Sequence, residues 1–348
     1  MIHPVTNAIG HGGEQGAGAA GRFRARILGP SLMILALECL LQVSARADVR
    51  MVMANPAEDC STQMNVGWHA DLDETSCELV YTDKADTAWT RAATVAGKSR
   101  RSDVFDGIDS KTREGKDWKE DAKFLDYGVT LTGLKPDTEY MYRIRRNGDD
   151  AGASAVRYFK TAGAGEFSFL WFSDVHAYTP LPGRVRNLNS VLDAALKIEP
   201  GVDFVFSTGD VVAWGGSYSF WKDLIEQPFA KNYMFADVIG NHDWMMRRDG
   251  GRSEFFAVAH NNPTNGYSGQ EGTCYWFIYG DVLFMTFNNE VMKTNPEAEA
   301  TAKTWAARSS SKTRRSCCST RRTSRAAPVE SAPLTPTTRP GSGRSGTA

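Results

Sequence analysis

Three short apolar segments, each followed at once by a polar motif, constrain the fold of this chain more than any other feature. The motifs are Ser-Asp-Val-His at 173–176, Gly-Asp at 209–210 and Gly-Asn-His-Asp at 240–243. From the Asp of one motif to the Asp or Asn of the next, the spacing is 36 and then 31 residues. Each interval is long enough for one crossover between parallel strands.

The segments around these motifs predict an α/β arrangement. We expect strands at 167–172, 204–207 and 235–239, helices at 184–198 and around 221–229, and a hairpin of strands at 274–279 and 282–287. Continuous apolar strands that alternate with helices indicate a largely parallel sheet covered on both faces. Because the carboxyl ends of such strands line the ligand crevice, the three motifs should converge on one edge of the sheet.

The side chains of the motifs are of the types that bind metal ions. Carboxylate and imidazole groups bind Fe, Zn or Mn, and one carboxylate can bridge two ions. Two such ions hold a hydroxide for in-line attack on phosphorus and neutralise the phosphoryl oxygens. The glycines before Asp210 and Asn241 should let the backbone turn sharply beside the metals. A single motif is compatible with an ordinary turn, but the three in order favour a metal site.

Residues 49–162 predict a separate all-β module. Short runs at 64–68 and 77–81 have the composition of strands. The segment 131–144, LTGLKPDTEYMYRI, places a Lys-Pro-Asp turn between two strands, and we interpret its alternating tyrosines as core residues. This segment resembles the late strands of the fibronectin type III sandwich.

The order D-x-H, G-D, G-N-H-D resembles the calcineurin-like metallophosphoesterases. The preceding β-sandwich is similar to that of the purple acid phosphatase-like branch of this family. The resemblance extends from the sandwich to Trp305 and implies an α/β metallophosphoesterase fold, with layered β-sheets and flanking helices, over residues 166–305. It also implies metal-dependent hydrolysis of a small phosphorylated substrate, as in an acid phosphatase.

The resemblance assigns a role to each motif residue. Asp174 and His176 would bind the first metal ion, and Asp210 would bridge the two ions. Asn241 would bind the second ion. His242 would contact the phosphate and protonate the leaving group as a general acid.

Two departures from the family pattern limit this assignment. Purple acid phosphatases place an iron-binding tyrosine three residues after the bridging Asp, where this chain has Ala213, so no tyrosinate colour is expected. The family also has a later V-x-x-H histidine and a G-H-x-H pair, which this sequence lacks. The second metal is left with Asp210 and Asn241, which form an incomplete site, and absent strands would leave part of the sheet uncovered. The six histidines are His3, His11, His69, His176, His242 and His260.

Two of these histidines lie outside the motifs but inside the folded part. We expect His69 to be structural and His260 to be a loop residue that binds no metal.

The N-terminal 47 residues resemble an export signal. Three arginines at 22–26 precede an apolar run at 31–41 and an A-x-A cleavage site that ends at Ala47. The run is too short to cross a bilayer, so we expect a secreted or periplasmic protein with no membrane association beyond export. In such an oxidising compartment Cys60 and Cys77 could form a disulfide, and two separate thiols are the alternative.

The C-terminal residues 306–348 differ sharply from the rest. They contain no aromatic residue and many Ser, Thr, Arg and Pro, so a disordered tail or a shifted reading frame is expected. From residue 308 onward there are nine basic residues and one acidic, although the whole chain has a net charge of −1. The remainder is therefore acidic, which argues against nucleic acid as a partner.

Three functions stay open from the sequence. The first is a metal-dependent phosphoester hydrolase, active or inactivated by the missing histidines. The second is a phosphodiesterase or nucleotidase on the same fold. The third is a catalytically inactive secreted binding or adhesion module in which the sandwich carries the function.

Overall fold

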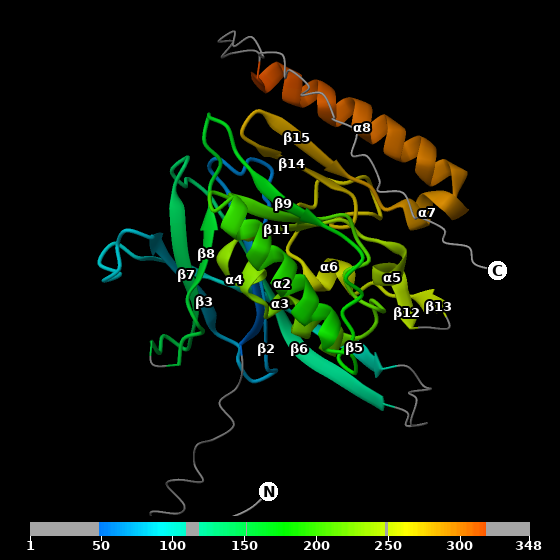
Figure 1. Ribbon diagram of the computed structural model, residues 1–348, viewed down its shortest axis with the longest axis horizontal. Coiled ribbons are helices and arrows are strands. Elements are labelled where there is room, and N and C mark those ends of the chain that lie inside the picture. The colour runs from blue at the N-terminus through cyan, green and yellow to red at the C-terminus, as the bar shows by residue number, and fades with distance from the viewer. Residues whose placement is uncertain (1–48, 109–117, 151, 248–249, 318–348) are drawn as a thin grey trace, which may run out of the picture. The chain divides into compact units, whose positions relative to one another are not determined.

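The computed structural model describes residues 49–317, apart from 109–117, 151 and 248–249 (Figure 1). The expected export signal and the tail from residue 318 lie outside these described residues. All described residues belong to one compact unit, and the boundary expected between 162 and 166 stays a prediction. Within the part that is described, no helix is long and apolar enough to cross a membrane.

Two four-stranded antiparallel sheets form the first part of the structure. Their strands are β1 (Arg50–Asn55), β2 (Met64–Ala70), β3 (Cys77–Asp83), β4 (Ala93–Ala96), β5 (Lys98–Ile108), β6 (Trp118–Leu131), β7 (Glu139–Arg146) and β8 (Arg157–Lys160). One sheet has the order β1-β2-β6-β5 and the other β4-β3-β7-β8. The expected turn at 135–137 therefore carries the chain from one sheet to the other.

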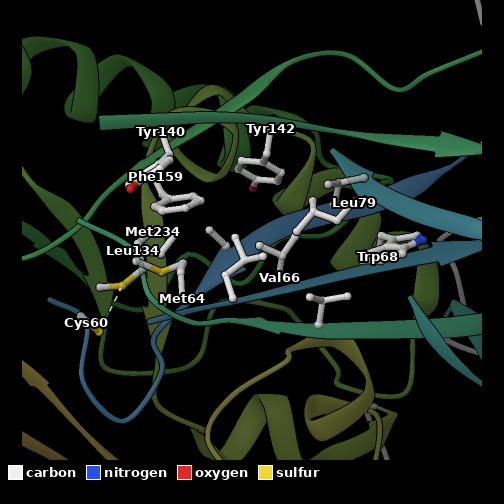
Figure 2. Close-up of a cluster of buried hydrophobic side chains, with 14 of the residues drawn as sticks. Cys60, Met64, Val66, Trp68, Leu79, Leu134, Tyr140, Tyr142, Phe159 and Met234 are labelled. Atoms are coloured by element: carbon white, nitrogen blue, oxygen red, sulfur yellow. Dashed lines mark hydrogen bonds between the residues drawn. The ribbon is translucent and has the colours of Figure 1, made fainter. Parts of the chain in front are cut away.

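Apolar side chains of both sheets meet in a shared core, which Figure 2 shows. Trp68 stacks on Tyr127 with ring centroids 5.1 Å apart, and Tyr140 stacks on Phe159 at 5.3 Å. Tyr140 and Tyr142 are buried, which confirms that these tyrosines belong to the core. Burial of such rings is the main stabilising term of the sandwich.

The cysteines Cys60 and Cys77 are separate buried thiols, so the disulfide alternative is not formed. The sulfur of Cys60 lies 3.5 Å from the carbonyl oxygen of Ala57 and 3.9 Å from the sulfur of Met234. The sulfur of Cys77 lies 3.7 Å from the carbonyl oxygen of Glu74. Burial raises the pKa of Cys60 to about 12, which keeps this thiol protonated and unreactive.

The next part alternates strands and helices, as expected. Its elements are β9 (Phe169–Phe172), α2 (Gly183–Ile198), β10 (Phe204–Ser207), α3 (Tyr218–Ile225), α4 (Pro228–Asn232), β11 (Met234–Asp237) and α5 (Asn241–Trp244). The three strands form a parallel sheet in the order β11-β10-β9. The single helix expected around 221–229 is two helices, because Pro228 lacks an N–H and is suited to the first turn of α4.

The expectation that this sheet is covered on both faces is wrong for β9. Trp171 is 68% exposed and Phe169 is 39% exposed, whereas Phe204 in the neighbouring β10 is fully buried. Among the described strands β9 pairs with β10 alone, so it forms an edge whose side chains have neighbours on one side only.

The remaining elements follow the third motif. They are β12 (Met245–Arg247), β13 (Gly250–Arg252), α6 (Phe256–Ala259), β14 (Tyr275–Tyr279), β15 (Val282–Thr286), α7 (Asn289–Thr294) and α8 (Pro296–Cys317). The expected hairpin is present as β14 and β15. Phe277 and Phe284 of this hairpin stack at 4.7 Å and contact Phe204 of β10, so the hairpin packs on the central strand.

The expectation of an unfolded tail from residue 306 is wrong as far as Cys317. Residues 306–317 continue α8, which contacts β15 (Figure 1). The segment is poor in apolar residues, but its Ala, Arg and Lys have high helix propensity. Trp305 anchors the helix, since its indole N–H donates to the carbonyl oxygen of Asn265 at 2.7 Å.

His69 is buried and structural, as expected. Its ring stacks on Phe124 with centroids 4.1 Å apart. Its Nε2 lies 3.1 Å from the carbonyl oxygen of Val258, and its Nδ1 lies 3.4 Å from the hydroxyl of Tyr218. Burial lowers the pKa of His69 to about 3, and the positive charges of Arg50 and Arg100 add to this effect.

Acid is therefore expected to destabilise the protein through His69. The pKa of histidine in an unfolded chain is about 6.5, so between pH 6.5 and 3 the unfolded state binds one more proton than the folded state. The free energy of unfolding should fall on acidification by up to about 1.4 kcal/mol per pH unit. Urea unfolding of the wild type and His69→Gln at pH 7 and 5 measures this. The variant keeps an N–H donor for Val258 and should show the smaller difference; equal differences would contradict the prediction.

Candidate metal centre

The carboxyl ends of β9, β10 and β11 bring the three motifs together. His176, Asp210 and His242 each offer a ligand atom, and these atoms lie within 4.8 Å of one another. His176 Nε2 is 3.7 Å from Asp210 Oδ2, and the two imidazole rings meet edge to face with centroids 4.3 Å apart. Of the groups of three or more His, Cys, Asp or Glu in residues that the structure describes, this is the only one that could hold a metal ion.

Backbone hydrogen bonds hold the first two motifs side by side beyond their strands. The N–H groups of Asp174 and His176 donate to the carbonyl oxygens of Gly209 and Asp210, at 3.1 and 2.9 Å. These bonds continue the parallel pairing of β9 with β10. The second of these bonds brings His176 next to Asp210.

Three of the predicted ligands have a backbone conformation that L-residues seldom adopt. The φ angle is +58° at Asp174, +49° at His176 and +55° at Asp210. Such a conformation costs on the order of 1–3 kcal/mol per residue and persists only where the surrounding structure imposes it. Here the hydrogen bonds between the two motifs impose it, and this kind of strain is concentrated at functional sites.

Two glycines allow the second and third motifs to approach closely. Gly209 has a φ of +103°, so the expected sharp turn occurs there. Gly240 has a φ of −93°, which any residue can adopt, and its role is to leave space. A Cβ atom on Gly240 would overlap the carboxylate of Asp210, and one on Gly209 would lie 2.7 Å from the nitrogen of Gly240.

The backbone also determines which ring nitrogen of each histidine is available. Nδ1 of His176 is 3.1 Å from the carbonyl oxygen of Asp174, and Nδ1 of His242 is 2.8 Å from that of Ala213. A carbonyl oxygen only accepts, so each Nδ1 carries the hydrogen and each Nε2 keeps its lone pair in the neutral ring. A carbonyl partner of this kind is typical of histidines that bind metals.

The other two predicted ligands, Asp174 and Asn241, lie next to this group in sequence but are not part of it. Asp174 is exposed, and its Oδ2 accepts a hydrogen bond from the hydroxyl of Ser173 at 2.6 Å. Asn241 is exposed at the first position of α5. The structure thus brings together His176, Asp210 and the predicted general acid His242.

A buried pair of titratable groups, Asp237 and His260, was missed by the sequence analysis. Nε2 of His260 lies 3.4 Å from Oδ2 of Asp237, and neither side chain is exposed. His260 is not one of the three residues grouped above; it lies in the loop directly after α6, and its side chain is buried. Burial raises the pKa of Asp237. An acid inside the apolar segment Phe235–Ile239 is the sequence signal that could have revealed this pair.

The comparisons with known proteins agree with this architecture. Residues 49–161 match the purple acid phosphatase N-terminal domain, and residues 167–315 match the calcineurin-like phosphoesterase family. Among solved structures the chain is similar to purple acid phosphatase PPD1 from yellow lupin (Lupinus luteus) seeds, with 17% identity and a TM-score of 0.50. That match covers 69% of this chain and 44% of the lupin chain, so this chain spans less than half the length of the lupin protein.

A second solved structure, that of PhoD, matches with 13% identity and a TM-score of 0.38, over 67% of this chain and 50% of that one. No curated protein matches the chain. The two family matches and the lupin structure establish the fold as that of the metallophosphoesterases. The chain therefore carries a calcineurin-like phosphoesterase domain at residues 167–315, and a purple acid phosphatase N-terminal domain precedes it at residues 49–161.

Proposed function

We propose that this chain is a metal-dependent phosphoester hydrolase of the acid phosphatase type that acts on a small phosphorylated substrate. The observation that carries the proposal is the convergence of His176, Asp210 and His242 at the carboxyl edge of a parallel sheet. That edge is where α/β folds place their ligands, and the three groups have the chemistry of a metal-assisted hydrolase. Hydrolysis would take place in residues 166–305, with residues 49–162 as a supporting sandwich of the fibronectin type III kind.

The donor set fits Fe, Zn or Mn. Asp174 and His176 would supply a carboxylate and an imidazole to the first ion, and Asp210 a carboxylate shared by two ions. Asn241 would supply an amide oxygen to the second ion, and with Asp210 it would form an incomplete site. Ions bound there would act as Lewis acids on the phosphoryl oxygens and lower the pKa of bound water.

The chain's own residues would orient the site and move the proton. Oδ1 of Asp210 accepts the backbone N–H of His242 at 2.9 Å, while Oδ2 faces His176. One oxygen of this carboxylate thus holds the backbone of His242, and the other would share an ion with Nε2 of His176. With Nδ1 of His242 held by Ala213, its Nε2 is the atom that would protonate the leaving oxygen.

The proposal is tested on the purified full chain, supplied with Zn, Mn or Fe. We expect at least one bound metal per chain by elemental analysis, together with hydrolysis of p-nitrophenyl phosphate that a chelator abolishes. Hydrolysis of bis(p-nitrophenyl) phosphate, measured in parallel, distinguishes a phosphodiesterase from a monoesterase. Less than one metal per chain and no hydrolysis would contradict the proposal and favour the inactive binding or adhesion module.

The proposal includes export, for which the A-x-A site at 45–47 is the support. The exported product should begin at Asp48. N-terminal sequencing of protein recovered from the extracytoplasmic fraction measures this, and an intact N-terminus there would contradict it.

A further inference from the structure

Asp243, the last residue of the third motif, lies at the junction of the second and third motifs. It is completely buried, and its two carboxylate oxygens accept four backbone hydrogen bonds. Oδ2 accepts from Asp210 at 2.7 Å and from Gly240 at 2.9 Å. Oδ1 accepts from Val211 at 3.0 Å and from Val212 at 3.1 Å.

These four donors are backbone N–H groups of the two loops that carry the candidate ligands. Three are consecutive N–H groups that begin at Asp210, and the fourth belongs to the residue before Asn241. A carboxylate has about four acceptor positions, so the four bonds use them all. Each bond joins this side chain to a backbone N–H, so Asp243 constrains both loops.

We propose that Asp243 is a positioning residue, which holds the backbone of Asp210 and of Asn241-His242 in the geometry that binds metal. The inference rests on the proposed function, since it assumes that these residues bind metal. Asp243 itself would bind neither metal nor substrate. Asp243 acts through the loops, because its oxygens are occupied by the four N–H groups.

The same segment contains a matched comparison, Asp237. It is also a fully buried aspartate close to the motif, but its carboxylate faces a side chain, since Nε2 of His260 lies 3.4 Å from its Oδ2. Asp237→Asn should cost stability without moving the metal ligands. Asp243→Asn keeps the shape of the side chain but has one acceptor oxygen, and its amide N–H groups would face N–H donors.

The test measures binding of cobalt(II) alone to the full chain, by calorimetry and visible absorption, beside urea unfolding of the metal-free protein. We expect Asp243→Asn to weaken cobalt binding by about 10- to 100-fold, the usual effect of losing a group that orients metal ligands, and to change the visible spectrum. Asp237→Asn should keep the wild-type affinity and spectrum although its unfolding free energy falls.

Each outcome decides between the alternatives. Wild-type affinity in Asp243→Asn, or an equal loss in Asp237→Asn, would overturn the inference while leaving the proposed function intact. Absence of cobalt binding by the wild type would overturn both. If Asp243→Asn does not fold, Asp243→Glu and Asp243→Gln replace it, because Glu keeps both carboxylate oxygens and Gln keeps one. The Asp243→Glu variant should bind cobalt at least about tenfold more tightly than the Asp243→Gln variant. Equal affinities of the two variants would overturn the inference.

Discussion

Replacement of Asp210 by asparagine is expected to abolish metal binding and, with it, the hydrolysis of an aryl phosphate. Asparagine keeps an oxygen that can accept the N–H of His242, and it tolerates the φ of +55° at this position. The loss is therefore confined to the negative charge and to the second oxygen, which faces His176. The affinity for metal should fall by more than about 100-fold, beyond the usual effect of residues that only support ligands.

Metal content after dialysis and the rate of p-nitrophenyl phosphate hydrolysis measure the effect of Asp210→Asn. Asp137→Asn is the matched control, since Asp137 also has a positive φ, of +47°, and lies in an exposed turn where it pairs with Lys160. The control should bind metal and hydrolyse substrate as the wild type does. Wild-type metal content in Asp210→Asn would show that the carboxylate is not a ligand.

Replacement of His242 by asparagine is expected to lower kcat by about 10²- to 10⁴-fold, the usual contribution of a general acid, while metal content stays at the wild-type level. The asparagine amide can take the place of Nδ1 and donate to the carbonyl oxygen of Ala213, which is 2.8 Å from Nδ1 in the wild type. It has no group in the position of Nε2. The change therefore removes the proton donor and keeps the local hydrogen bond.

The dependence on the leaving group makes this prediction specific. Phenyl phosphate has a poor leaving group that needs a proton, so the full loss should appear with it. The leaving group of p-nitrophenyl phosphate departs as an anion more readily, so the loss should be much smaller. Equal losses with both substrates would argue against general acid catalysis. A fall in metal content would instead make His242 a ligand, together with His176 and Asp210.

Much of the fold follows from local patterns in the chain. The apolar runs at 204–207 and 275–279 are strands, and the periodic segment at 184–198 is a helix within one residue of its bounds. Predictions of helix and disorder were wrong where one local sequence signal competed with another. Pro228 divides a helix that periodicity alone predicts as continuous. The polar composition from 306 onward suggests disorder, yet the helix propensity of its Ala, Arg and Lys sustains α8 to Cys317.

The candidate site was also predictable in part, because some of its residues follow from local sequence patterns. Asp210 and His242 stand directly after strands, so a strand prediction is enough to place them at one sheet edge. Asp237 and Asp243 could not be interpreted in this way. An aspartate in an apolar segment gives no indication of whether it pairs with a histidine, as Asp237 does, or accepts backbone N–H groups.

Local pattern was enough to predict the β-rich first part, the alternating α/β part, and three motifs in order whose side chains are of the types that bind metals. Long-range packing decided which of those side chains meet. The hydrogen bond from the N–H of His176 to the carbonyl oxygen of Asp210 brings these two residues together beyond the strands. The carboxylate of Asp243 joins loops about thirty residues apart in sequence. Side-chain type is encoded residue by residue, whereas hydrogen bonds between distant loops exist only after the sheet has formed. For that reason the contacts of Asp243 with both loops became evident only in the folded chain.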